Sequence, residues 1–307
     1  MKQKVASAVI PAAGRGNRMY PLTKSIPKEL LPLVDRPVIL TVMEEGVRAG
    51  IEQFHVVTSP QKPALREFFS PEPEENPCPR IEFPQVNFVV QEQARGLGHA
   101  VLQAKEAIGN MPFVVQLPDD IFHEEDPLLQ TMLRVHEHTS GCVVALMEVS
   151  LEEVGAYSTT AAQRETFTAE ITGNHKVFRL SRIVEKPTPE QVQSPYAIMG
   201  RYVLSPQIFE VLERTPPGRN DEIQLTDALA VLADTPPELG GGVWGVVSRG
   251  RHFDTGNMRG YLRAQAELSL EHKFLGTDLQ ERLRHLLCQG EGNTTSSLET
   301  TEGEGNN

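Results

Sequence analysis

The feature that most constrains the fold is an alternation of short apolar runs with amphipathic segments through the first half of the chain. The first run, Val5–Ala13, is mostly apolar and leads into glycine-rich sequence, which is typical of a strand buried on both faces. Pro37–Ala49 follows with apolar residues at helical spacing and ends before Gly50. Strands joined by such helices pair in parallel. We therefore predict an α/β fold, with a Rossmann-like mixed, mostly parallel, doubly wound sheet and helices on both faces.

The same pattern locates the other elements. Strands are predicted at 54–58, 87–91, 113–117, 142–149 and 242–247, and helices at 62–69, 98–108, 127–138, 207–214, 225–233, 260–272 and 278–287. Between Ser150 and Pro206 the pattern changes to short strands separated by turns, which predicts a small antiparallel insertion. Ser70–Pro84 is rich in proline and glutamate and is expected to be an exposed loop.

The C-terminus differs in composition from the rest. Residues 289–307 contain four Glu, no Lys or Arg and one large apolar residue, so they bury too little apolar surface to offset the entropy of folding. We predict a folded domain over 1–275, a C-terminal helix over 276–288 and a disordered acidic tail over 289–307. The helix carries an apolar stripe that fits a subunit interface and an intramolecular core equally well: Leu279, Leu283, Leu286 and Leu287.

Charge and cysteine usage narrow the class of protein. A formal net charge of −12 argues against nucleic acid as a partner, because such binding draws on a basic surface. A small anionic substrate stays possible, since a few local cations can hold it. No apolar run approaches the roughly 18 residues of a membrane span, and the N-terminus lacks the apolar region of a signal peptide. Three widely separated cysteines support neither a disulfide framework nor a cysteine metal site, so we expect a cytoplasmic protein: Cys78, Cys142 and Cys288.

A glycine-rich loop follows the first predicted strand. Its Gly14-x-Gly16 suggests a dinucleotide fingerprint, but Met19 occupies the third glycine position and prolines follow where a helix should open. No P-loop lysine follows either. The loop instead carries closely spaced cations that could neutralise a phosphate chain: Arg15, Arg18, Lys24 and Lys28. The residues alone leave open a second interpretation, a strained turn with ordinary surface cations.

Three carboxylates occur at candidate metal positions. Asp119 and Asp120 end the apolar run 113–117, at the edge where open α/β sheets bind ligands. Asp254 precedes a predicted helix. From the residues alone, a polar strand end and a helix N-cap remain alternatives to a metal site.

The glycine-rich loop resembles the signature of the sugar-1-phosphate nucleotidylyltransferases, in the form Gly14-x-Gly16-x-Arg18-x-x-Pro21-x-Thr23-Lys24-x-x-Pro27-Lys28-Glu29. Its continuation, 26–34, is similar to the branch that uses UTP and glucose-1-phosphate. Six further blocks keep the order of that family over most of the chain: Gly96-Leu97-Gly98-His99-Ala100, Leu117-Pro118-Asp119-Asp120, Val184-Glu185-Lys186-Pro187, Gly200-Arg201-Tyr202-Val203-Leu204-Ser205, Glu222-Ile223-Gln224-Leu225-Thr226-Asp227-Ala228 and Phe253-Asp254-Thr255-Gly256-Asn257.

The resemblance implies a reaction and its participants. A sugar-phosphate oxygen attacks the α-phosphorus of UTP in line and releases pyrophosphate, assisted by Mg²⁺ on Asp119 and Asp254. Arg18, Lys28 and Lys186 would be catalytic: Arg18 on the leaving pyrophosphate, Lys28 near the α-phosphate and Lys186 on the sugar phosphate. Homo-oligomers, dimers or tetramers, are expected.

The resemblance also divides the binding residues between two parts of the chain. The nucleotide-binding part covers about 1–149, and the sugar-binding insertion about 150–206. The nucleotide would contact Ala12, Ala13, Gly14, Gly16, Glu29, Gln91, Gly96 and Asp119. The sugar would contact Tyr157, Glu185, Lys186 and Gly200. His99 is interpreted as structural rather than as a catalytic base, since a phosphate nucleophile is already ionised at neutral pH.

Three departures from the family pattern bear on specificity. Asn17 stands where a threonine is usual, Ser158 stands where a Tyr-Gly pair usually brings backbone close to the sugar, and the 70–84 connection is shorter than usual. Alternatives therefore remain: another triphosphate (dTTP, CTP or ATP), another sugar phosphate, or a catalytically silent homologue. A silent homologue should have lost the loop cations or metal carboxylates, and this chain retains both.

Overall fold

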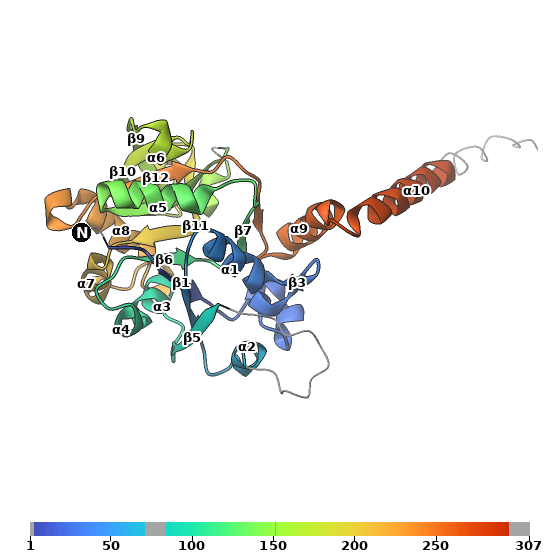
Figure 1. Cartoon of the computed structure of the whole chain (residues 1–307), viewed down its shortest axis with the longest axis horizontal. Helices are drawn as coiled ribbons and strands as arrows, with labels where there is room; N and C mark the ends of the chain where they lie inside the picture. The colour runs from blue at the N-terminus through green and yellow to red at the C-terminus, as the bar shows by residue number, and fades with distance from the viewer. Residues whose placement is uncertain (1–2, 71–83, 151, 295–307) are drawn as a thin grey trace, which may run out of the picture.

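The computed structural model of this chain describes residues 3–70, 84–150 and 152–294. A nine-stranded sheet forms its centre, with the strand order β5-β4-β1-β6-β11-β8-β12-β10-β9 (Figure 1). The strands are β1 Ser7–Pro11, β4 Gln53–Thr58, β5 Gln85–Val90, β6 Phe113–Gln116, β8 Cys142–Glu148, β9 Ser158–Arg164, β10 Val177–Glu185, β11 Tyr196–Leu204 and β12 Val243–Val247.

The sheet is mixed, as predicted. The run β5-β4-β1-β6 is parallel, and β8 pairs with β12 in parallel. Strands β10 and β11 point the opposite way, so every pair that they form is antiparallel. Most strands therefore share one direction, although five of the pairs in the sheet are antiparallel and four are parallel.

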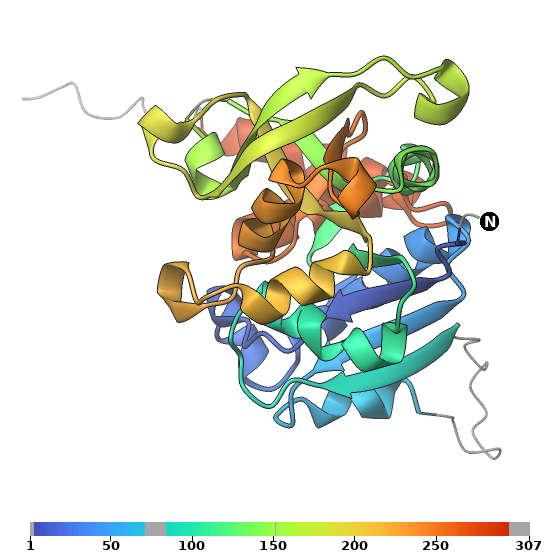
Figure 2. The same cartoon turned by 90° about the vertical axis from the view of Figure 1, so that its left-hand side faces the viewer.

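Helices cover both faces of the sheet, and Figure 2 looks onto one of these faces, with its helices in front of the strands. One face packs against α1 Val38–Arg48 and α5 Leu128–Thr139 through a fully apolar cluster. The other packs against α3 Leu97–Gln103, α4 Lys105–Ile108, α7 Gln207–Arg214 and α8 Leu225–Asp234. Residues such as Phe113 and Phe209, whose rings stack 5.0 Å apart, are almost wholly buried, and each such side chain contributes about 1.5–3 kcal/mol to folding.

The segment predicted as an antiparallel insertion joins the main sheet. Strands β9 and β10 form one edge of that sheet as an antiparallel pair, and β11 lies in its middle between β6 and β8; with seven to nine residues each, they are longer than the short strands that were predicted. This arrangement brings residues from 158–204 next to the ends of β6 and of α8.

Two elements beside the cavities differ from the prediction in kind and not only by a residue or two at their ends. The helix predicted over 98–108 is two helices, because the N–H of Ala104 bonds the carbonyl of Val101 in a tight turn that ends α3. A separate two-stranded antiparallel sheet, β7 Asp120–Phe122 with β13 His252–Asp254, was not predicted, since three-residue strands leave no periodic signal. In this small sheet Asp120 lies opposite Asp254.

The C-terminal helices form an arm. α9 Met258–Glu271 packs against the body, and α10 Gly276–Thr294 packs against α9 and extends away from the sheet (Figure 1). α10 runs six residues past the predicted tail boundary at 289, because adding a residue to an existing helix costs little. The rest of the predicted tail, and most of the predicted 70–84 loop, lie outside the described residues.

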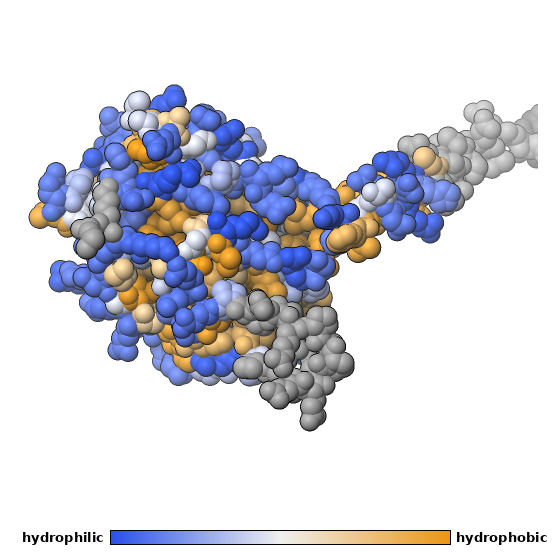
Figure 3. Space-filling model, viewed as in Figure 1, coloured by the Kyte–Doolittle hydropathy of each residue, from blue (hydrophilic) through white to orange (hydrophobic). Residues whose placement is uncertain are grey.

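The apolar stripe of α10 is not part of an intramolecular core. Leu286 and Leu287 are exposed, as are Phe274 and Leu275 in the turn before the helix. Figure 3 shows apolar surface where the arm leaves the body. Of the helices described, none is long and apolar enough to cross a membrane.

Candidate active site

Three neighbouring cavities form a groove beside the carboxyl ends of β1, β4 and β6. The first has a volume of about 880 Å³ and is lined by the glycine-rich loop and by residues 91–95. The second, about 490 Å³, shares Gly14 and Gln91 with it and reaches Asp119. The third, about 190 Å³, shares Leu117 with the second and reaches Glu185. The groove is thus continuous from the loop to the edge of β10.

The glycine-rich loop folds into short 3-10 turns, Asn17–Met19, Leu22–Lys24 and Lys28–Leu30, rather than a helix. The turns are tied together by the Thr23 hydroxyl, which donates to the carbonyl of Gly16 at 2.9 Å. Gly14, Gly16 and Asn17 line the cavities, while Met19 is buried against Leu31 and Tyr261 of α9. Burying Met19 leaves the Arg18 side chain two-thirds exposed at the second cavity.

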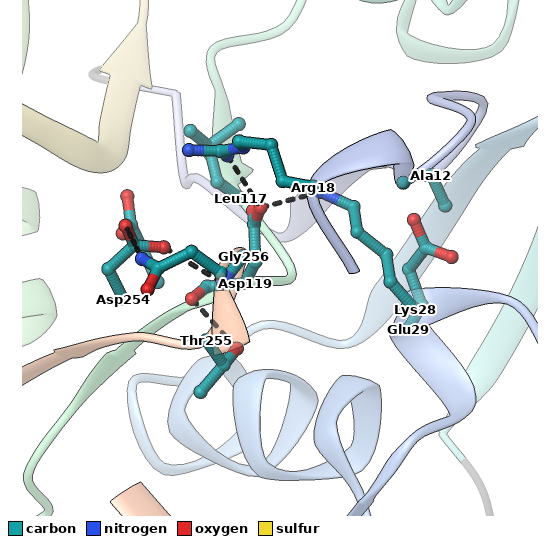
Figure 4. A network of polar contacts seen from close by, with 12 residues as sticks. Ala12, Arg18, Lys28, Glu29, Leu117, Asp119, Asp254, Thr255 and Gly256 are labelled. Carbon is teal, nitrogen blue, oxygen red and sulfur yellow. Dashed lines mark hydrogen bonds and ion pairs between the residues drawn. The ribbon is translucent and has the colours of Figure 1, made fainter. Parts of the chain in front are cut away.

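Cations from this loop converge on Asp119, which lies between β6 and β7. The Lys28 Nζ is 2.5 Å from Asp119 Oδ2, and an Arg18 Nη2 is 3.9 Å from the same oxygen (Figure 4). Burial lowers the pKa of Lys28, but the charges of Asp119 and Glu29 outweigh it and raise that pKa above its usual value. Burial likewise raises the pKa of Asp119, yet the charge of Lys28 overcomes it and the net shift is downward. Both groups are therefore charged at neutral pH.

Asp254 brings a second carboxylate to Asp119. A Cβ on Gly256 would stand 2.5 Å from Asp119 Oδ2 and 3.0 Å from Asp254 Oδ1, so the missing side chain leaves both oxygens facing one small space. The Gly256 N–H and the Asn257 amide fix Asp254 by donating to its carboxylate. The N-cap of α9 is Asn257, whose side chain accepts from Gly260 N–H, so the N-cap interpretation of Asp254 is wrong.

Arg201 supports the loop that carries Asp119, a role that no pattern in the sequence indicated. Its guanidinium is fully buried, pairs with Glu45 at 2.7 Å, and donates to the carbonyls of Leu117 at 3.1 Å and Asp120 at 2.7 Å. These carbonyls flank Asp119 on both sides. The side chain is therefore a positioning residue for the carboxylate.

Glu29 and Ala12 lie behind the cavity wall. Glu29 is buried and accepts both its hydrogen bonds from Lys62, at 2.9 and 3.0 Å, and Lys62 also donates to the Ala12 carbonyl. Burial raises the pKa of Glu29 and lowers that of Lys62, each opposed by the charge of the other. Neither Glu29 nor Ala12 is among the residues that line the three cavities, whereas Lys62, which the sequence did not single out, lines the first.

Gln91 and Gly96 meet between the first two cavities. The Gln91 amide nitrogen lies 2.8 Å from His99 Nδ1 and 3.4 Å from the Gly96 carbonyl. Burial, together with the charge of Arg95, lowers the pKa of His99. Neutral His99 thus holds the nitrogen end of the Gln91 amide, which leaves the amide oxygen for a ligand. These contacts favour a structural role for His99.

Most of the sugar-binding residues predicted from sequence line the third cavity, namely Tyr157, Glu185 and Gly200, together with Ser158 and Asp120. Gly200 makes room for Asp120, because a Cβ there would lie 2.2 Å from Asp120 Oδ2. Lys186 is beside this cavity rather than among its lining residues. Its Nζ is 3.9 Å from Glu185 Oε1, and its backbone adopts a left-handed φ of 44°, with the N–H bonded to the Tyr157 carbonyl.

Comparisons with known proteins agree with this arrangement. A sequence profile described as nucleotidyl transferase matches residues 7–270. The UTP–glucose-1-phosphate uridylyltransferase of Streptococcus pneumoniae is 37% identical over 303 residues, which cover 93% of this chain and 97% of the relative. A UTP-bound UGPase from Acinetobacter baumannii superposes with a TM-score of 0.78 at 33% identity, covering 92% of this chain and 99% of that one. A UDP-glucose pyrophosphorylase complexed with UDP-glucose superposes with a TM-score of 0.75 at 34% identity, covering 86% and 98%.

Proposed function

This chain belongs to the nucleotidyl transferase family, and on that premise we propose that it transfers a uridylyl group from UTP to glucose-1-phosphate, giving UDP-glucose and pyrophosphate. The observation that carries the proposal is the continuous groove in which Asp119, Lys28 and Arg18 meet between a large cavity and a small one. We call the first cavity the base end, the surroundings of Asp119 the phosphate end, and the third cavity the sugar end.

The reaction brings two polyanions together, so charge and alignment decide its rate. A phosphate oxygen of the sugar phosphate forms a bond to the α-phosphorus as the bond to the β-phosphate oxygen breaks, and pyrophosphate carries away the electron pair. Arg18, exposed and planar, suits the leaving pyrophosphate, while the buried ammonium of Lys28 suits the α-phosphate. Lys186, next to Glu185, suits the incoming sugar phosphate. No covalent enzyme intermediate is needed.

Asp119 and Asp254 fit a small divalent cation. Their oxygens face the space that Gly256 leaves open, and two carboxylates plus substrate phosphates are the kind of site that Mg²⁺ takes. Among the described residues no cluster of three or more His, Cys, Asp or Glu has metal-binding geometry, so phosphate oxygens and water would complete the shell. When bound, Mg²⁺ supplies charge stabilisation to the phosphoryl group.

The base and sugar ends supply recognition. The free oxygen of the Gln91 amide can accept from the N–H of uracil, beside the backbone of Gly96. Glu185 can accept hydrogen bonds from sugar hydroxyls in the third cavity. The second candidate function is the same transfer with another triphosphate or another sugar phosphate, because Ser158 forms part of the wall of that cavity.

A pyrophosphate-release screen tests the proposal. UTP, dTTP, CTP and ATP are each paired with glucose-1-phosphate and with its C2 and C4 epimers, in the presence of Mg²⁺. We expect UTP with glucose-1-phosphate to give the highest kcat/KM. A higher kcat/KM with another pair would replace the substrate assignment. If no pair gave pyrophosphate release, the assignment as a nucleotidyltransferase would be contradicted.

The exposed stripe of the arm supports a homo-oligomer as the working form. Leu286 and Leu287 lie 47% and 72% exposed on a helix that extends from the body, and burying them against a second copy would repay their exposure. Light scattering of Leu287→Glu should show a lower mass than the unaltered protein, with Val231→Glu, an exposed apolar residue on α8, as control.

We place this enzyme in the cytoplasm, where UTP is available and the free cysteines Cys142 and Cys288 stay reduced.

A further inference from the structure

Ser158 holds one oxygen of Glu185 at the sugar end. It is the first residue of β9 and lies in register with Glu185 on β10 and with Ile198 on β11. Its side chain is buried, lines the third cavity, and donates a hydrogen bond from Oγ to Glu185 Oε2.

A second hydroxyl donates to the same oxygen. Thr226, in the first turn of α8, places its Oγ1 3.0 Å from Glu185 Oε2. A carboxylate oxygen has two lone-pair directions, so these two donors occupy Oε2. Oε1 is left for a ligand, with Lys186 Nζ 3.9 Å away.

This geometry limits what Glu185 can recognise. A carboxylate with both oxygens available can accept from two neighbouring hydroxyls of a sugar and tolerates several stereochemistries. With only Oε1 available, its acceptor directions are confined to the lone pairs of one oxygen in a fixed carboxylate plane, so fewer stereochemistries can reach it. The one hydroxyl hydrogen of Ser158 is engaged in the hydrogen bond to Glu185, so Ser158 can offer a ligand only an acceptor lone pair.

Resting on the proposed function, we propose that Ser158 is a specificity-determining residue: with Thr226 it fixes Glu185 so that the sugar end accepts one configuration at the hydroxyl that Oε1 binds. The hydroxyl is a ring hydroxyl of a hexose-1-phosphate. A glycine at this position would leave Glu185 with one donor fewer and the cavity wider, and the discrimination between epimers would weaken.

The test compares three variants of the full chain with saturating UTP and Mg²⁺. Ser158→Ala removes only the hydroxyl, Ser158→Thr restores one, and Thr159→Val removes the neighbouring hydroxyl, which faces backbone carbonyls at Ser194 and Tyr196 instead of the cavity. The readout is the ratio of kcat/KM for glucose-1-phosphate to that for mannose-1-phosphate and galactose-1-phosphate, with KM for UTP alongside.

We expect Ser158→Ala to lower that ratio about tenfold for at least one epimer, because a site loses discrimination when a hydrogen bond to a charged group is removed. Ser158→Thr should recover most of the ratio, and KM for UTP should stay unchanged in all three. A ratio in Ser158→Ala equal to that of Thr159→Val would overturn the inference.

The failure of the proposed function gives a different result. If the unaltered protein releases no pyrophosphate with any pair, the function fails, and calorimetric binding of UDP-glucose against UDP-galactose then tests Ser158 by itself. An unchanged preference between these two ligands in Ser158→Ala would reject the role of Ser158. A lowered preference would support it.

Discussion

At the phosphate end of the groove charged side chains lie against one another, whereas at the sugar end the carboxylate of Glu185 accepts from two hydroxyls. Asp119 is paired with Lys28 at 2.5 Å and approached by Arg18, so cations are already in place where a triphosphate would enter. Glu185 instead accepts from Ser158 and Thr226, which are neutral.

The difference reflects what each end has to recognise. A polyphosphate presents charge in every direction, so cations serve without fine orientation. A sugar presents hydroxyls that differ only in direction, so the acceptor must be fixed in angle, and neutral donors do this without cancelling its charge. Changes at the phosphate end should therefore reduce turnover for every substrate, and changes at the sugar end should alter the choice among substrates.

The largest effect is expected for Asp119→Asn. The change removes the charge that pairs with Lys28 and one of the carboxylates that we propose to hold Mg²⁺, so kcat should fall about 10³-fold. Steady-state pyrophosphate release measures it, and far-UV circular dichroism checks that the fold persists. Asp35→Asn, a surface carboxylate in the turn between the short strands β2 Pro32–Leu33 and β3 Arg36–Pro37, is the control. Full turnover of Asp119→Asn with Mg²⁺ would remove the phosphate end from this position.

A smaller effect is expected for Arg201→Lys, which acts through the same carboxylate. Lysine cannot donate to Glu45 and to the carbonyls on both sides of Asp119 together, so we expect kcat to fall about 10–100-fold with a similar loss for all sugar phosphates. Arg134→Lys, which also loses donation to a backbone carbonyl, that of Ile171, controls for general destabilisation. A change confined to one sugar would break the comparison between the ends.

Lys186→Ala should affect the sugar end selectively. Loss of its ammonium next to Glu185 should raise KM for glucose-1-phosphate about tenfold and leave KM for UTP nearly unchanged. Initial rates at varied sugar phosphate and fixed UTP measure this. The control is Lys176→Ala, which alters an exposed lysine at the opposite end of β10. Equal increases in both KM values would mean that Lys186 serves the phosphate end as well.

The phosphate end could be predicted more fully than the sugar end, for a physical reason. Arg18 and Lys28 lie within one short loop, and the residue type that ends a buried strand, Asp119, is visible in the sequence. The support that Arg201 gives to the backbone on both sides of Asp119 depends on how β11 pairs with β6, which no local pattern encodes.

The partners of Glu185 were less accessible to sequence reasoning. Ser158 and Thr226 lie 27 and 41 residues from it, on a strand and a helix whose registers only the fold fixes. Ser158 was noticed as a departure from the family pattern, but its hydrogen bond was not. The α/β architecture followed from the alternation of apolar and amphipathic segments, while the three-residue strands β7 and β13, too short to show a period, did not.

A buried pair of side chains, His175 and Asp126, lies away from the cavities and connects segments that lead to the two ends of the groove. His175 Nε2 is 2.6 Å from Asp126 Oδ1, and the other oxygen of Asp126 accepts from Ser248 Oγ and from the N–H groups of Arg249 and Gly250. Asp126 follows β7, His175 precedes β10, and residues 248–250 precede β13. The carboxylate therefore connects the segment that follows β7 to the segments that lead into β10 and β13, the strands that end in Glu185 and Asp254.

The smallest effect on catalysis, and a measurable one on stability, is expected for Asp126→Asn. Burial raises the pKa of Asp126, but the hydrogen bonds from His175 and the loop outweigh it and lower the pKa to about 2. A carboxyl whose pKa is lowered on folding contributes stability above its unfolded pKa, near 4, and loses it as pH falls towards 2. A shift of about two pKa units corresponds to about 2–3 kcal/mol. Urea unfolding of the unaltered protein and of Asp126→Asn at pH 7, 5, 4 and 3 should show a difference in the free energy of unfolding that narrows as the pH falls. Pyrophosphate release at pH 7 should be retained in the variant. A gap independent of pH would mean that Asp126 stabilises the join by packing and not by charge, and a loss of turnover would mean that the join also sets the geometry of one end.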